Sequence, residues 1–118
     1  MYVPLRSAKI FDLKIAAEDE ATMSAYVLSE VEILDESAAS SYRELAATSI
    51  AAYGGHYLAR AAEAQVVDGQ PSKRRMVTVE FPSMQRLREW YASPEYAEAL
   101  KHRKTALDRR LMFVEGTT

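Results

Sequence analysis

The 118-residue chain has no cysteine, so disulfide bonds, thiolate metal sites and cysteine nucleophiles are excluded. It has two histidines, His56 and His102, which lie far apart in the sequence, and a transition-metal site is therefore not expected. Glycine-rich phosphate loops are missing too, since the pair Gly54-Gly55 follows a predicted helix instead of preceding one. No cofactor or metal is expected, and the lack of cysteine favours a cytoplasmic location.

Long apolar runs and an excess of one charge are also missing. No run approaches the roughly 18 residues of a membrane-spanning helix, and charges interrupt residues 1–14 too often for a signal peptide. The formal net charge is -2, and the one basic cluster, Lys73-Arg74-Arg75, is short and reads as a solvated turn. Neither a membrane nor a nucleic acid is therefore expected as a partner.

The hydrophobic pattern predicts a β-α-β-β-α-β order. Alternating apolar residues predict strands over residues 25–34, 56–62, 75–81 and 109–115. Asp35 caps the first helix, and a glycine pair ends it. The second helix is broken at Ser93-Pro94, where serine caps a new start and proline suits the first helical position. This order is that of a ferredoxin-like α+β plait, an antiparallel sheet with helices on one face.

Alternation gives each strand two faces. The set expected to face the helices is Val27, Val31, Ile33, Tyr57, Ala59, Val77, Val79 and Phe81. The opposite set mixes large apolar residues with charged ones and comprises Tyr26, Leu28, Glu30, Glu32, His56, Leu58, Arg60, Met76, Thr78 and Glu80. A solvent face would not need the apolar members, and a buried face would not hold unpaired charges. We therefore expect two copies to pack through this face as a homodimeric barrel around a partly polar cavity.

Several short motifs occur in a fixed order along the chain. They are Ala25-Tyr26-Val27, Ala52-Tyr53-Gly54-Gly55, Tyr57-Leu58-Ala59-Arg60, Glu80-Phe81-Pro82-Ser83, Trp90-Tyr91-Ala92-Ser93-Pro94-Glu95-Tyr96, Arg103 and Val114-Glu115-Gly116. Over residues 24–116 this pattern resembles the DUF1330 family, small bacterial proteins of the dimeric α/β-barrel superfamily. The resemblance implies a ferredoxin-like subunit and a homodimer with face-to-face sheets, and it implies no established activity. It also implies a glycine pair where this chain has Ala61-Ala62, so a β-bulge there is less expected.

Residues 1–24 lack a clean hydrophobic period and precede the first motif. They are interpreted as an N-terminal arm or extension outside the family domain. The domain is predicted over residues 25–116, and residues 117–118 are a short tail. The apolar residues of the arm could dock on the body or on a partner subunit.

Arg60 and Glu80 fall on neighbouring predicted strands and on the same expected face. One interpretation is a ligand site in which Arg60 binds an anion and Glu80 orients it or acts as a base. The other is a cross-strand ion pair that satisfies both groups. His56 is a second candidate base or ligand contact, or else a half-exposed residue at a strand end. Glu30, on the same face, is a further candidate for ligand binding.

Aromatic side chains supply the remaining candidates. Tyr42, Tyr53, Tyr91 and Tyr96 could wall a pocket and offer hydroxyls to a ligand, or they could belong to the core or the interface. Trp90 is expected to be a packing anchor. Ser49 has no histidine and acid at motif spacing, so a serine nucleophile is not expected.

Three functions stay open. The first is a homodimer that binds a small organic ligand in or near the barrel. The second is a cofactor-free monooxygenase or isomerase acting on a small aromatic or enolisable acid, in which Arg60 holds the carboxylate and Glu80 or His56 moves a proton. The third is a structural dimer without a ligand. The fold alone does not separate them.

Overall fold

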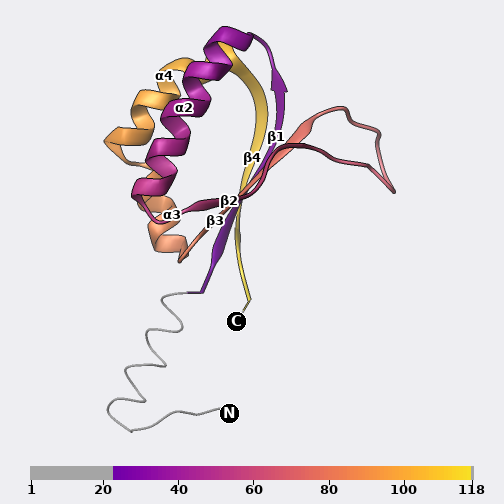
Figure 1. Cartoon of the computed structure of the whole chain (residues 1–118). Coiled ribbons are helices and arrows are strands. Elements are labelled where there is room, and N and C mark those ends of the chain that lie inside the picture. Colours follow the sequence, from indigo (N-terminus) through magenta and orange to yellow (C-terminus); the bar gives the residue numbers. More distant parts are fainter. Residues whose placement is uncertain (1–22, 118) are drawn as a thin grey trace, which may run out of the picture.

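The computed structural model describes residues 23–117. Its elements are β1 (Ala25–Ile33), α2 (Glu36–Ala52), β2 (His56–Glu63), β3 (Arg75–Phe81), α3 (Met84–Tyr91), α4 (Pro94–Ala106) and β4 (Leu107–Glu115). They form two layers, a layer of helices against a sheet (Figure 1). The predicted N-terminal arm, apart from its last two residues, lies outside the described residues, as does the end of the predicted tail.

The strands form one sheet in the order β2-β3-β1-β4, and each neighbouring pair is antiparallel. The helices cover one face of this sheet and, among residues 23–117, leave the other face without a helix (Figure 1). The second helix of the β-α-β-β-α-β order is divided into α3 and α4. This is the ferredoxin-like α+β plait that the sequence predicts, and each strand bound agrees with the prediction to within two residues.

Polar side chains cap the helices as predicted. Asp35 Oδ1 accepts a hydrogen bond from the Ala38 amide at 2.8 Å at the start of α2. Ser93 Oγ accepts from the Tyr96 amide at 3.0 Å and donates to the Trp90 carbonyl at 2.7 Å. The Ser93 side chain therefore satisfies one backbone group at the end of α3 and one backbone group at the start of α4.

An aromatic cluster forms the centre of the core. The centroid of the Trp90 ring lies 5.2 Å from that of Phe81 on β3 and 4.3 Å from that of Tyr96 on α4. Its indole Nε1 donates to Ser49 Oγ on α2 at 2.9 Å, so this buried polar group is satisfied. Trp90 is 2% exposed and is the packing anchor that the sequence predicts.

Strand β2 departs from simple alternation. Its pairing with β3 shifts between Tyr57 and Ala59 and again between Ala59 and Ala62, so each shift inserts one extra residue in β2. Ala61 lies in the second shift with a φ of 53°, a left-handed conformation that alanine rarely adopts. A β-bulge is therefore present at Ala61-Ala62, and the prediction that disfavoured one there was wrong.

The extra residues reverse the direction of two side chains. Tyr57 pairs with Val79 and faces the helices, as predicted. Ala59 pairs with Thr78, which belongs to the face without helices, and Arg60 lies on the helix side of the sheet. The predictions for Ala59 and Arg60 were wrong because a slip of one residue turns every following side chain to the other face.

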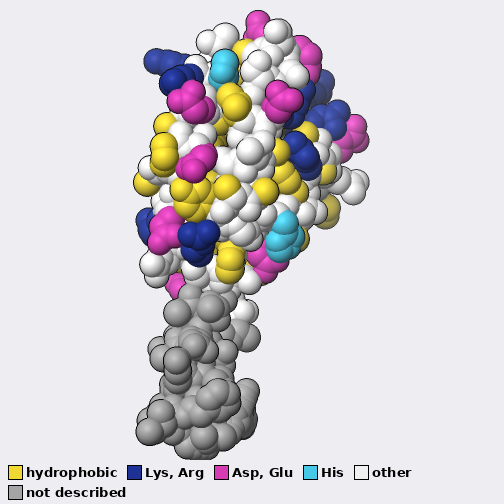
Figure 2. Space-filling view, turned by 60° about the vertical axis from the view of Figure 1, so that its left-hand side comes forward, with side chains coloured by type: hydrophobic (Ala, Val, Ile, Leu, Met, Phe, Trp, Pro, Cys, Tyr) yellow, Lys and Arg dark blue, Asp and Glu magenta, His cyan; other side chains and the backbone are white. Residues whose placement is uncertain are grey.

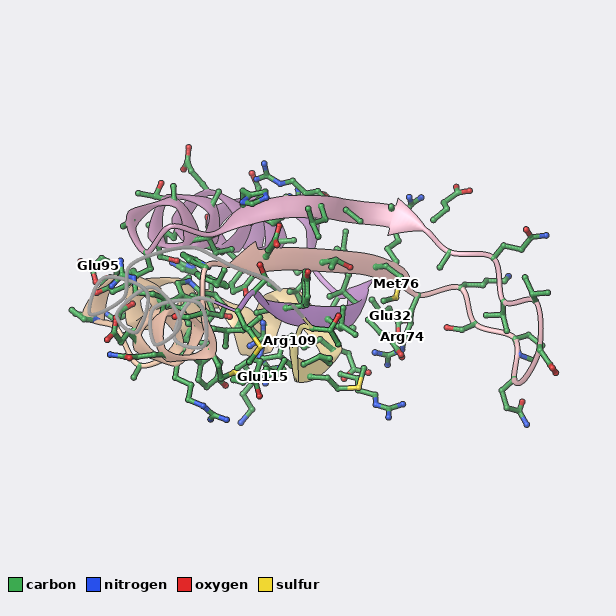
Figure 3. The ribbon with its side chains drawn as sticks, turned by 90° about the horizontal axis from the view of Figure 1, so that it is seen from below. Glu32, Arg74, Met76, Glu95, Arg109 and Glu115 are labelled. Atoms are coloured by element: carbon green, nitrogen blue, oxygen red, sulfur yellow. The ribbon has the colours of Figure 1, made fainter. Side chains whose placement is uncertain are left out.

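Residues 64–74 form a hairpin arm between β2 and β3, which reaches away from both layers (Figure 1). Val67 in this arm is 88% exposed. At its base, Arg74 Nη2 lies 2.6 Å from Asp108 Oδ2 and 4.0 Å from Glu32 Oε1, and Figure 3 shows Glu32 and Arg74 side by side. The basic cluster is therefore more than a solvated turn, because Arg74 ties the arm to the sheet.

The surface carries charges of both signs. Figure 2 shows acidic and basic side chains interspersed among apolar ones, in agreement with the small net charge of -2. Within residues 23–117, the helices are all too short or too polar to cross a membrane.

Candidate functional site

A cavity lies between the sheet and the helix layer. Its volume is about 70 Å³, on a scale where one water molecule needs roughly 10–15 Å³, so it accepts a few waters or part of a small ligand. The apolar walls include Val27, Val31, Ala46, Ile50, Val79 and Trp90. The polar side chains in the lining are Ser29, Tyr42, Arg43, Tyr57, Arg60 and Arg109. Apolar walls with a few convergent polar groups are typical of small-molecule sites.

Arg109 brings a positive charge into this cavity. Arg109 points toward the helices because it shares one face of strand β4 with Leu107 and Leu111, which also line the cavity. Its Nη1 donates to the hydroxyls of Tyr42 and Tyr96, each at 2.9 Å, and these two hydroxyls lie 2.6 Å apart. Side chains of α2, α4 and β4 thus meet in one network, and Figure 3 shows Arg109 in the middle of the body.

This network keeps Arg109 charged and Tyr96 neutral. Burial raises the pKa of Tyr96 above its usual value, and Tyr42 adds to this effect while Arg109 opposes it. Burial lowers the pKa of Arg109, but the two tyrosine oxygens raise it by more, so that it ends above its ordinary value. Burial also raises the pKa of Tyr57. At neutral pH the cavity therefore offers positive charge and hydrogen-bond donors.

Ser29 contributes a buried hydroxyl to the cavity. It is 4% exposed, and its Oγ has no hydrogen-bond partner among residues 23–117. Its neighbours across the sheet are the apolar residues Val77 and Leu111. An unsatisfied buried hydroxyl costs about 1–3 kcal/mol, so a water molecule or a ligand in the cavity would stabilise it.

Arg60 lies at the exposed side of the same cavity. Its guanidinium carbon is 4.4 Å from the centroid of the Tyr57 ring, a distance that allows a cation–π interaction. Neither Arg60 nor Arg109 has an ion-pair partner within residues 23–117. The two charges in the cavity are therefore not balanced by a carboxylate of the described chain.

Glu80 and His56 form a separate pair on the face without helices. His56 Nε2 lies 3.2 Å from Glu80 Oε1, and the Tyr26 hydroxyl donates to Glu80 Oε2 at 3.5 Å. Glu80 and Arg60 lie on opposite sides of the sheet, so the predicted common site or ion pair of these two residues was wrong. Within residues 23–117, no group of three or more histidine or acidic side chains is arranged to hold a metal ion.

Of the remaining predicted candidates, Tyr42 lines the cavity and the others lie outside its lining. Glu30 is on the face without helices, where its carbonyl accepts a hydrogen bond from the hairpin arm at 3.3 Å. Tyr53 donates to Glu95 Oε1 at 3.0 Å, at an exposed position. Tyr91 is 39% exposed. Of those outside the lining, Tyr96 alone is connected to the cavity, through its hydrogen bond with the arginine of β4.

Two cavity residues carried a signal that the sequence predictions did not use. Arg109 occupies an inward position of an alternating strand, between Leu107 and Leu111, where a charge is unusual. Ser29 is likewise a small polar residue on the core face of β1, where it faces the helices with Val27 and Val31. Each is a polar interruption of an apolar face, which is the pattern that a buried site would produce.

Comparison with protein-family models finds a match to the domain of unknown function DUF1330 over residues 24–117. The chain belongs to the DUF1330 family. The match covers every described helix and strand. Comparison with curated proteins gives no significant match.

Solved structures share the fold of this DUF1330 chain at low sequence identity. A protein of unknown function from Rhodopseudomonas palustris is 19% identical with a TM-score of 0.69, over 96% of each chain. A dimeric protein of ferredoxin-like fold from Bacteroides fragilis is 11% identical with a TM-score of 0.53, over 78% of this chain and 95% of its own. The cofactor-independent oxygenase SnoaB from Streptomyces nogalater is 8% identical with a TM-score of 0.51, over 80% and 94%. At these identities the likeness establishes the ferredoxin-like fold alone.

Proposed function

We propose that this DUF1330 protein binds a small organic ligand in the cavity between the sheet and the helices, and that it acts as a homodimer. The observation that carries the proposal is the buried Ser29 hydroxyl, which has no partner among residues 23–117. This cavity lies on the helix side of the sheet, whereas the sequence predicts a ligand in or near the barrel. It is supported by the apolar walls and by the unbalanced charges of Arg60 and Arg109.

Thermal-shift measurements with small aromatic acids, keto acids and their amides test the binding. A ligand that binds the folded state raises the melting temperature by mass action. Ser29→Val removes the hydroxyl and puts a larger apolar group into the cavity, so we expect it to abolish every shift. Thr78→Val makes a comparable change on the other face of the sheet and should keep the shifts. The proposal fails if no compound stabilises the wild type, or if Ser29→Val is stabilised equally.

The face without helices supports the homodimer. Leu28, Met76 and Met112 lie on this face and are only half-buried in a single chain, beside Glu30 and Arg110, which are cross-strand neighbours. Packing against a second copy would remove these large apolar side chains from water. The similar protein from Bacteroides fragilis is described as dimeric.

Light scattering tests the dimer. We expect the wild type to show twice the 13.3 kDa mass of the chain. Leu28→Arg places a charge at the centre of the proposed interface and should give a folded monomer. Leu34→Arg is the matched control, because Leu34 follows β1 and is 56% exposed, and it should stay dimeric. A monomeric wild type would contradict the homodimer without affecting the ligand site.

A cofactor-independent oxygenase is a second candidate, favoured by the two guanidinium groups of the cavity. Arg60 and Arg109 could stabilise the negative charge of an enolate, and SnoaB shares the fold. Oxygen uptake with phenylpyruvate, an enolisable aromatic keto acid, tests this candidate, with Arg109→Gln as the variant expected to lose activity. Binding of the acid without oxygen uptake would leave ligand binding as the function.

A further inference from the structure

We infer that the ligand of this cavity is a small organic monocarboxylate with a flat apolar body. Arg109 binds the carboxylate, the Ser29 hydroxyl donates to the ligand, and Arg60 adds a second charge at the mouth. The inference rests on the proposed function, that the cavity binds a ligand, and it adds the chemical class of that ligand.

Within residues 23–117, the charged Arg109 donates hydrogen bonds only to neutral groups. Its hydrogen bonds run from Nη1 to the hydroxyls of Tyr42 and Tyr96, and its Nε and Nη2 form none with the part of the chain that the structure describes. Arg43, which also lines the cavity, is balanced by Glu36 at 3.0 Å. A guanidinium partly removed from water is stabilised by an anion, and its geometry matches a carboxylate with two parallel hydrogen bonds.

The polar groups of the cavity follow one another from its floor to its mouth. Ser29 is buried, whereas Arg60 is exposed and lies over the Tyr57 ring. The described side chains of the lining include arginines, tyrosines and a serine, and no carboxylate. Their combined potential is positive and attracts an anion into the cavity.

The apolar walls and the small volume of the cavity limit the rest of the ligand. Val79 on β3, Ile50 on α2 and Trp90 on α3 surround the polar groups with apolar surface. Such walls favour a ligand whose remaining atoms are apolar and disfavour a fully hydrated anion such as inorganic phosphate. The volume of about 70 Å³ is about half that of a cavity that holds benzene. It therefore restricts the ligand to about one small ring, part of which would lie at the open mouth beside Arg60.

Isothermal titration calorimetry with benzoate, benzamide and inorganic phosphate tests the inference. Benzamide has the shape of benzoate without its charge. We expect the wild type to bind benzoate at least about tenfold more tightly than benzamide and to bind phosphate more weakly than both. Arg109→Gln and Arg60→Gln should each reduce the affinity for benzoate and leave that for benzamide unchanged. Arg110→Gln changes the neighbouring residue on the other face of β4 and should behave as the wild type.

The outcomes separate this inference from the proposed function. Equal affinities for benzoate and benzamide would overturn the carboxylate class and leave the ligand site intact. Tighter binding of phosphate than of benzoate would overturn the apolar body. If neither benzoate nor benzamide binds, the inference is overturned. The thermal-shift panel still decides whether the cavity binds other compounds. Arg109→Gln loses hydrogen bonds in the core, so near-ultraviolet circular dichroism checks its fold. If Arg109→Gln does not fold, Arg60→Gln, at the exposed mouth, provides the test in its place.

Discussion

At the scale of single residues, Ala61 holds a backbone conformation on which the cavity depends. Its φ of 53° costs alanine about 1–2 kcal/mol, and glycine adopts it freely. We expect Ala61→Gly to raise the free energy of unfolding by about 0.5–1 kcal/mol, because the relief of strain exceeds the entropy that glycine adds to the unfolded chain. Urea denaturation measures the change.

Ala62→Gly is the control for this prediction. Ala62 is the next residue and lies outside the left-handed region, so glycine there only adds freedom to the unfolded chain. The free energy of unfolding of the Ala62→Gly variant should therefore fall by about 0.5–1 kcal/mol. Equal losses in both variants would show that Ala61 is not strained.

Tyr96 gives stability a dependence on alkaline pH. Its pKa is raised by burial in the folded state, so above about pH 10 the unfolded chain releases this proton while the folded protein keeps it. The unfolded state then binds fewer protons, and the free energy of unfolding falls as the pH rises, by up to about 1.4 kcal/mol per pH unit. Below about pH 10 this contribution is fully present and constant.

Urea denaturation across this alkaline range checks the slope. Tyr96→Phe should be about 1 kcal/mol less stable near neutral pH, because it loses hydrogen bonds to Tyr42 and Arg109. It should also show a smaller slope, and the part that remains comes from Tyr57 and Tyr53. Burial raises the pKa of Tyr57, and the hydrogen bond to Glu95 raises that of Tyr53. Tyr91→Phe should keep the full slope. An unchanged slope in Tyr96→Phe would contradict the attribution of the alkaline pH dependence to Tyr96.

At the scale of elements, the junction of α3 and α4 depends on Ser93. Its hydroxyl accepts from one helix and donates to the other, so Ser93→Ala leaves the buried Tyr96 amide without its partner. The Trp90 carbonyl also loses one bond, although it still accepts from the Ser93 amide at 3.0 Å. We expect a loss of about 1 kcal/mol or more in the free energy of unfolding. Ser40→Ala, at an exposed position inside α2, is the matched control and should be neutral or slightly stabilising. A neutral Ser93→Ala would show that the aromatic cluster alone holds the junction.

These elements could be predicted because their signals are local. The cap at Ser93 and the alternation of Val27 and Val31 need only neighbouring residues to be recognised. The direction of Arg60 could not be predicted, because the period of two carries no mark of an extra residue inserted in β2. The role of Arg109 depends on hydroxyls that α2 and α4 bring from distant parts of the chain, so the sequence shows an unusual inward charge and not its partners.

At the scale of the whole molecule, the hairpin arm stands apart from the body (Figure 1). We expect replacement of residues 65–72 by an Asn-Gly turn to change the free energy of unfolding of a monomeric background by no more than about 0.5 kcal/mol, since few core contacts are lost and loop closure becomes easier. The replacement keeps Arg74 and its ion pair with Asp108. Leu28→Arg supplies the background, and urea denaturation supplies the measurement.

The same replacement in the wild type shows what the arm does in the assembly. If light scattering finds a weaker dimer, the arm contributes to the contact between copies. A large loss of stability in the monomeric background would instead mean that the arm belongs to the core.

The aromatic core also gives the protein an optical property. Trp90 is the only tryptophan in the chain, and its ring lines the cavity. Indole fluorescence responds to the polarity and packing around the ring, so the emission of the unmodified protein reports whether the cavity is filled. The ring also lies 4.3 Å from that of Tyr96, whose hydroxyl accepts from Arg109. A ligand that engages this arginine would therefore be registered in the emission spectrum, and stopped-flow fluorescence could follow its entry and release without a label.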